Sequence, residues 1–169
     1  MGHHDGTMAV LAGLGLAVLL AWSVGTRTGT WRDRGRWGLT VLLVVAGSAH
    51  LVNPLPFLQH LPPVVPGRAF LVAATGVIEI GLGVALLGPA VWRRTVGRVV
   101  AVYFVAVFPA NVYVAVAGVD VDGLPGGPYP WLRLPLQIVL IAWALWCTMA
   151  DDKAHRDRAG VRRRAAWRC

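Results

Sequence analysis

Five side chains able to bind oxygen atoms or exchange a proton lie inside otherwise apolar segments of the sequence. Glu79 and His50 can each gain or lose a proton, whereas Asn111, Arg133 and Gln137 carry amide or guanidinium groups. Such groups are costly within hydrocarbon, so in membrane helices they face the interior of a bundle and one another. The sequence therefore predicts a polar pocket inside a membrane helix bundle.

The composition is that of a membrane protein. Of the 169 residues, 56% are hydrophobic and 14% are charged, and the mean hydropathy is +0.60, which is far more apolar than an ordinary soluble domain. The length suits one compact bundle rather than two domains. Cys147 and Cys169 form neither a C-x-x-C pair nor a disulfide framework. The net charge of +8 does not indicate nucleic-acid binding, because no nucleic-acid motif accompanies it.

Five apolar runs approach or reach the length of about 20 residues that an α-helix needs to cross a bilayer. The first, residues 8–24, is at the short limit for a membrane-spanning helix and could instead be a signal peptide. No Lys or Arg precedes it and no A-x-A site follows it, which favours a retained helix. The other runs are residues 37–53, 69–88, 96–118 and 131–150. We therefore expect an all-α bundle of five membrane helices.

The basic residues fall on one side of these expected helices. Of the 16 Lys and Arg residues, 14 lie in the first connection, the third connection or the C-terminal tail; Arg68 and Arg133 lie on the other side. Short cytoplasmic loops are enriched in Lys and Arg, so five spans place the N-terminus outside and the C-terminus inside. Four spans would place both termini inside.

This orientation divides the chain into three parts. Residues 1–35 are expected to form an N-terminal transmembrane helix and a basic cytoplasmic loop, and residues 36–150 a four-helix membrane bundle. Residues 151–169 are expected to form a basic cytoplasmic tail, either solvated or in contact with anionic lipid headgroups.

The polar residues gather at one depth. At about 1.5 Å of rise per residue, His50, Arg133, Gln137 and Asn111 fall within about 10 Å of the outer helix ends. Glu79 lies about 15 Å deep, near the midplane. A lone carboxylate at that depth must be either protonated or paired with a cation, for which Arg133 is the candidate. Of these two alternatives we expect the protonated state, with Glu79 facing a ligand.

Each of these residues also has a purely structural interpretation. Arg133 could extend its charge to the outer interface, and Asn111 and Gln137 could form hydrogen bonds between helices. His50 is more typical of a satisfied interior histidine than of a metal ligand, and His60, in a Pro-rich connection, is expected at the surface. No metal site is predicted, because no second His or Cys has clear ligand spacing.

Two further sets of residues have expected places in the bundle. The glycines around Glu79 favour close contact between helices; they are Gly76, Gly81 and Gly83. Aromatic residues near the outer connections, which are Phe57, Tyr129 and Trp131, could form part of an interfacial aromatic belt.

Four stretches of the sequence resemble the DoxX family of small bacterial integral membrane proteins. They are AGSAHLVNPLPF with His50, TGVIEIGLGVALL with Glu79, VFPANVYVA with Asn111, and WLRLPLQIVLIAWAL with Arg133 and Gln137. They occur in the family's order between about residues 36 and 145. The resemblance implies a DoxX-like four-helix core in the bacterial cytoplasmic (inner) membrane, to which residues 8–24 add one helix.

The resemblance also implies an association with quinone-linked or membrane redox complexes, and three classes of function stay open. The first is a redox subunit that binds a quinone or another small molecule. In this class Glu79 and His50 are the catalytic, proton-exchanging residues, and the ligand is bound by Asn111, Arg133 and Gln137.

The second class is a non-catalytic membrane anchor or assembly subunit, in which the polar groups only join helices. The third is a small-solute carrier, disfavoured because the sequence shows no inverted repeat and no polar groups in the inner half. Expected partners are the lipid bilayer, a quinone or other small ligand and a membrane redox protein, with neither a metal nor nucleic acid. The missing thiol pair argues against a dithiol relay.

The distribution of charge predicts a definite membrane topology. Reporter domains fused at Arg34, Gly123 and the C-terminus are expected to report inside, outside and inside, because the basic segments stay in the cytoplasm. A C-terminal reporter found outside would contradict the assignment.

Overall fold

The computed structural model describes residues 29–121 and 128–149, and over these residues it contains helices and no strand. In chain order they are α2 (Trp31–Val52), α3 (Leu55–Gln59), α4 (Arg68–Ala85), α5 (Ala90–Ala117) and α6 (Tyr129–Thr148). Four of them, α2, α4, α5 and α6, are long and apolar enough to cross a membrane. The expected span at residues 8–24 and the tail at residues 151–169 lie outside the described residues.

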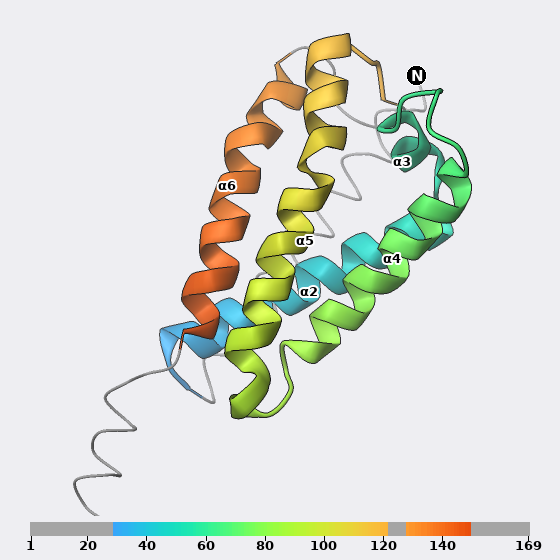
Figure 1. The fold of residues 1–169 in the computed structure, drawn as a ribbon. Coiled ribbons are helices and arrows are strands. Elements are labelled where there is room, and N and C mark those ends of the chain that lie inside the picture. Colours follow the sequence, from blue (N-terminus) through green and yellow to red (C-terminus); the bar gives the residue numbers. More distant parts are fainter. Residues whose placement is uncertain (1–28, 122–127, 150–169) are drawn as a thin grey trace, which may run out of the picture.

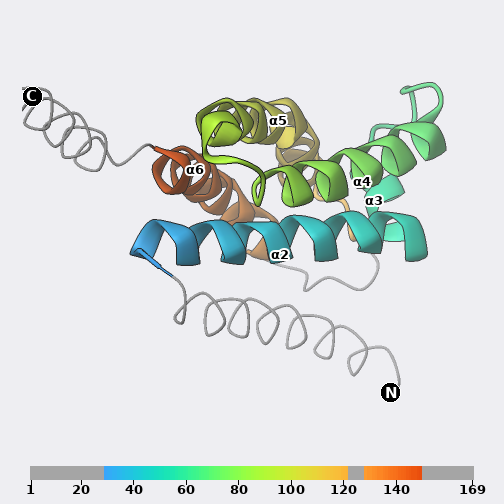
Figure 2. The ribbon, with the colours of Figure 1, turned by 90° about the horizontal axis from the view of Figure 1, so that it is seen from below.

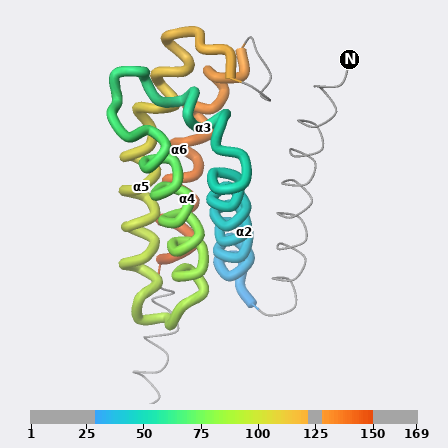
Figure 3. Tube along the Cα trace, turned by 90° about the vertical axis from the view of Figure 1, so that its right-hand side faces the viewer, coloured from blue at the N-terminus to red at the C-terminus, as the bar shows by residue number. Residues whose placement is uncertain are grey.

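The four long helices form an antiparallel bundle (Figure 1). Helix α2 packs along α4 and also contacts α6, as the view from below shows (Figure 2). Helix α5 packs along α6, whereas α4 and α5 contact each other much less. The short helix α3 lies at the end of the bundle where α2 ends and α4 begins (Figure 3). We call this the α3 end, and the opposite end, with residues 86–89, the turn end.

Helices α2 and α5 begin well before their apolar runs, α2 at Trp31 and α5 at Ala90. At the start of α2 the Thr30 hydroxyl accepts a hydrogen bond from the Asp33 backbone N–H, and the Asp33 carboxylate accepts one from the Thr30 N–H. This capping box stabilises the first turn. Helix α5 starts directly after Pro89.

Arginines expected in connecting loops therefore lie within helices, and the expected boundaries of those loops were wrong. They are Arg32, Arg34 and Arg36 in α2, and Arg93, Arg94 and Arg98 in α5. The domain limit expected at residue 35 consequently falls inside α2.

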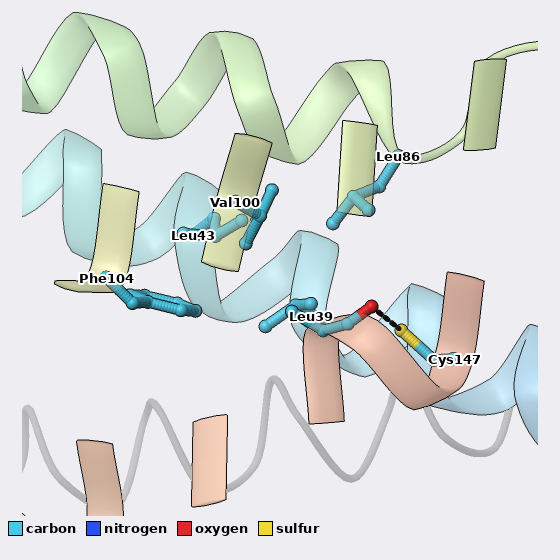
Figure 4. Packing of buried hydrophobic residues seen from close by; sticks show 7 residues of the cluster. Leu39, Leu43, Leu86, Val100, Phe104 and Cys147 are labelled. Carbon is cyan, nitrogen blue, oxygen red and sulfur yellow. Dashed lines mark hydrogen bonds between the residues drawn. The ribbon is translucent and has the colours of Figure 1, made fainter. Parts of the chain in front are cut away.

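An apolar core fills the turn-end half of the bundle. Its side chains point toward one another from α2, α5, α6 and the end of α4 (Figure 4) and are at most 5% exposed; those labelled there are Leu39, Leu43, Leu86, Val100, Phe104 and Cys147. Within lipid the surroundings of a helix are as apolar as such a core. Stabilisation therefore comes mainly from close packing and dispersion rather than from removal of water.

Helices α2 and α4 approach closely because glycines face each other. A Cβ atom added to Gly47 would lie 2.5 Å from the Gly76 carbonyl oxygen, and one added to Gly76 would lie 2.8 Å from the Gly47 carbonyl oxygen. Gly83 extends this contact, since a Cβ there would lie 3.1 Å from the Thr40 carbonyl oxygen. Gly81, which was expected to join the contact, has nothing within 4 Å of an added Cβ, so it faces away from the bundle.

The glycine contact predicts unequal effects of two matched substitutions in detergent-solubilised protein. Gly47→Ala should lower the free energy of unfolding by about 1–3 kcal/mol, because the new methyl group meets backbone that cannot move aside. Gly81→Ala is the control and should be neutral or stabilising by up to about 1 kcal/mol, since Ala favours helix. Equal thermal unfolding of the two variants would contradict the contact.

Candidate functional site

A cavity of about 600 Å³ occupies the bundle next to the apolar core, extending toward the α3 end. All five residues singled out from the sequence line it: His50, Glu79, Asn111, Arg133 and Gln137. They come from α2, α4, α5 and α6, so the antiparallel packing brings side chains distant in sequence to one place. The volume is typical of a small-molecule site.

The close contact of α2 and α4 places His50 beside Glu79. His50 lies one turn after Gly47, and Glu79 lies one turn after Gly76. A Cβ added to Gly76 would meet the Cβ of His50 at 2.8 Å, and one added to Gly47 would meet the Cβ of Glu79 at 3.0 Å. Each glycine therefore makes room for the polar side chain of the opposite helix.

The hydrogen bonds of His50 fix its tautomer. His50 Nδ1 is 2.8 Å from the Ala46 carbonyl oxygen, which can only accept, so Nδ1 carries a proton. The same nitrogen is 3.3 Å from Glu79 Oε2. In the neutral ring the other nitrogen, Nε2, then holds a free lone pair. Phe57 stacks on the ring with centroids 3.7 Å apart, so Phe57 belongs to the site rather than to an aromatic belt.

Glu79 is buried and has one strong hydrogen bond. The Tyr103 hydroxyl donates to Glu79 Oε1 at 2.8 Å, whereas Oε2 is buried and has no hydrogen-bond partner among the described residues. Of the two alternatives considered from the sequence, the ion pair is not formed: among the residues described, no Arg or Lys forms an ion pair with Glu79, and Arg133 binds His60. The alternative of an ion pair with Arg133 is therefore excluded, because Arg133 contacts His60 after α3 whereas Glu79 contacts Tyr103 of α5.

Arg133 is bound to His60, a residue expected at the surface. His60 is only 7% exposed, and its Nδ1 donates to the Pro56 carbonyl oxygen at 2.7 Å. Its Nε2 therefore accepts a hydrogen bond from the Arg133 guanidinium. Burial, and to a lesser extent the Arg133 charge, lower the pKa of His60 to about 4. The expectation of a surface His60 was wrong because the connection after α3 folds over the cavity.

A chain of hydrogen bonds joins α5 to α6. The Asn111 side-chain amide donates to Gln137 Oε1 at 3.2 Å, and Gln137 Nε2 donates to the Phe104 carbonyl oxygen at 2.8 Å. Gln137 is buried, whereas Asn111 is half-buried. These contacts match the interhelical hydrogen bonds considered from the sequence, and they also hold two amide groups at the cavity wall.

Three site residues did not stand out in the sequence. Tyr103 lies in an apolar run six residues before Pro109 and bears no local sign of its bond to Glu79. Phe57 and His60 flank the end of α3, and their spacing of three residues on a helical turn was the one available signal. Their burial depends on how the connection between α2 and α4 folds.

Comparison with known proteins identifies one family. The model of a family described as "Domain of unknown function (DUF8561)" matches residues 39–148, which is more than half of the chain and includes every residue of the site named above. No curated protein and no solved structure matches the chain.

The neutral, buried state of His60 predicts a pH dependence of stability. Because the pKa of His60 is lowered in the folded protein from 6.5 to about 4, the unfolded chain binds the proton first as pH falls. The contribution is complete above pH 6.5 and is lost as pH falls toward about 4, with a total of at most about 3 kcal/mol.

His60→Gln tests this expectation, since the amide oxygen can still accept from Arg133 but does not titrate. Unfolding measured in detergent across this pH range should show a flatter profile for the variant. An unchanged profile would contradict a buried, neutral His60.

Proposed function

The chain belongs to the family described as "Domain of unknown function (DUF8561)", and we propose that it is a membrane protein that binds a small lipid-soluble molecule of the quinone class. In this proposal it serves as a subunit of a membrane redox system. The observation that carries the proposal is the contact of half-buried His50 with buried Glu79 in the wall of a small-molecule-sized cavity.

The pair can exchange a proton with a bound ligand. His50 Nε2 is the free acceptor, and Nδ1 lies 3.3 Å from Glu79 Oε2. In the neutral pair, His50 Nε2 can take a proton from a ligand hydroxyl, which leaves an imidazolium. Glu79 can give its proton to a ligand oxygen, which leaves a carboxylate beside the ring. Both side chains line the cavity, so each can reach a bound ligand.

The resting state of this pair is the neutral one. Glu79 has no Arg or Lys partner among the described residues, and an unpaired charge within hydrocarbon is costly. The Tyr103 hydroxyl donates to Oε1, which leaves Oε2 as the oxygen that carries the proton. We therefore assign Glu79 as the group that gives a proton to the ligand and His50 as the group that accepts one from it.

The remaining polar groups would bind and orient the ligand. Arg133 uses one N–H on His60, and a guanidinium has five, so donors remain for a ligand oxygen. Asn111 and Gln137 lie on the same wall. The resemblance of the four motifs to the DoxX family supports a redox association in the bacterial inner membrane, with a membrane redox protein as the electron partner.

A non-catalytic anchor is the second candidate. The chain from Asn111 through Gln137 to the Phe104 carbonyl joins two helices and needs no ligand. In that case the polar groups would only hold the bundle together, and mutation of Glu79 would alter stability without altering binding.

The unique glutamate of the chain allows a direct test of its proton. Glu79 is the one Glu in the sequence, so protein grown with isotope-labelled glutamate carries the label at this side chain alone. Infrared spectra should show a protonated carboxyl band that moves with the label, disappears in Glu79→Gln and shifts when a quinone binds. Asp120→Asn, at an exposed position, is the matched control and should leave the band in place.

The same preparations test the ligand. Organic extraction and mass analysis of protein purified from its membrane should recover a quinone in amounts comparable to the protein. Retention of quinone by Glu79→Gln with loss of about 100-fold in proton-coupled turnover supports the proposal. A carboxyl band unaffected by quinone, together with no quinone in the extract, supports the anchor instead.

A further inference from the structure

The cavity is more open on one side than on the others. Of the described residues that line it, the exposed ones are Leu71 on α4 and Ala106 and Pro109 on α5. The lining residues of α2 and α6 are buried or half-buried. Within the described part of the chain, the cavity therefore reaches the exterior between α4 and α5.

The packing of the bundle explains why it opens there. Helix α4 is held to α2 by the glycine contact, and α5 packs along α6, so the two pairs of helices are each tightly joined. Helices α4 and α5 are linked at the turn end and diverge toward the α3 end (Figure 1). Pro109, at the rim, cannot donate to the Val105 carbonyl, which weakens α5 where it borders the opening.

The surface around the opening is apolar. Exposed side chains next to the rim include Phe70 at 75%, Val102 at 68% and Val105 at 57%. Both helices are long and apolar enough to cross a membrane, so these side chains face acyl chains rather than water. A water-soluble molecule would have to enter hydrocarbon to reach this opening.

The helices opposite the opening carry two of the groups that can bind a ligand oxygen. His50 on α2 offers Nε2, and Arg133 on α6 offers guanidinium N–H groups beyond the one bound to His60. The site therefore has an apolar side toward lipid and a polar side within the bundle. A ligand that matches both sides has an oxygen-bearing head and a hydrocarbon tail.

We propose that the gap between α4 and α5 is a lateral portal, through which a tailed amphiphile enters from the bilayer. Its head lies against His50 and Arg133, and its tail remains in the portal between Leu71 and Ala106. This inference rests on the proposed function, because the same cavity holds the ligand. The class of ligand it predicts, a tailed amphiphile, does not depend on any redox chemistry. A prenylated quinone and a fatty acid share this chemistry.

A bulky residue in the portal should obstruct the hydrocarbon tail of the ligand and so weaken its binding. In Ala106→Trp, the affinity for a long-tailed prenyl quinone should fall by about tenfold or more. The affinity for the same quinone ring with a methyl group in place of the tail should change much less. Ala142→Trp is the control, because Ala142 is an exposed alanine on α6 that does not line the cavity. Equal losses for both ligands, or no loss for either, would overturn the proposal.

Parallel titration with a long-chain fatty acid identifies the source of the tailed ligand. If Ala106→Trp weakens binding of the fatty acid and no quinone binds, the lateral portal is supported and the quinone-linked function is contradicted. If Ala106→Trp weakens binding of the prenyl quinone, both the lateral portal and the quinone-linked function are supported.

A spin label at Ala106→Cys tests the portal without any ligand. Cys169→Ser removes one native thiol, and Cys147 is buried in the apolar core. In vesicles the label should be relaxed by oxygen, which dissolves in lipid, and protected from a water-soluble nickel chelate. Relaxation by the nickel chelate would show an opening to water and overturn the lateral portal, even if quinone binding is confirmed.

Discussion

The close approach of α2 and α4 at Gly47 and Gly76 is the constraint on which the site depends. Each glycine lacks a side chain where the backbone of the other helix passes, so the two carbonyl groups define the helix separation. His50 and Glu79 follow these glycines by one helical turn and consequently face each other. In lipid such packing is itself a main source of helix association, because apolar surface gains little from leaving hydrocarbon. Stability and the geometry of the proton-exchanging pair thus share one origin.

The two halves of the bundle have different interiors, one filled by apolar side chains and the other lined by polar ones. In the turn-end half, apolar side chains from all four long helices fill the interior. Toward the α3 end, polar side chains satisfy one another across helices: Tyr103 with Glu79, Asn111 with Gln137, and Arg133 with His60. Buried polar groups are tolerated when they find partners, and the few atoms that do not are candidates for binding or proton transfer. Glu79 Oε2 is such an atom, and its neighbour is a titratable ring.

Two departures from the sequence-based expectations have clear physical causes. The arginines in the first turns of α2 and α5 were placed in loops because hydropathy detects the apolar part of a helix and not its charged start. The capping box at Thr30 is a local signal that could have moved the first boundary. The pairing of Arg133 with His60 had no comparable signal, since it joins a Pro-rich connection to a helix far along the chain.

The sequence by itself determined the helical class, the four described apolar helices and the residues that converge on one cavity, because hydrocarbon restricts both backbone and polar side chains. Depth along each helix follows from residue number alone, so the convergence of His50, Glu79 and Gln137 was predictable. Only the tertiary structure decided which groups are partners. Rotation of each helix about its axis, and the path of the connection over the cavity, are set by packing between segments distant in sequence. These contacts gave Glu79 a tyrosine and a histidine instead of an arginine, and left the cavity open between α4 and α5.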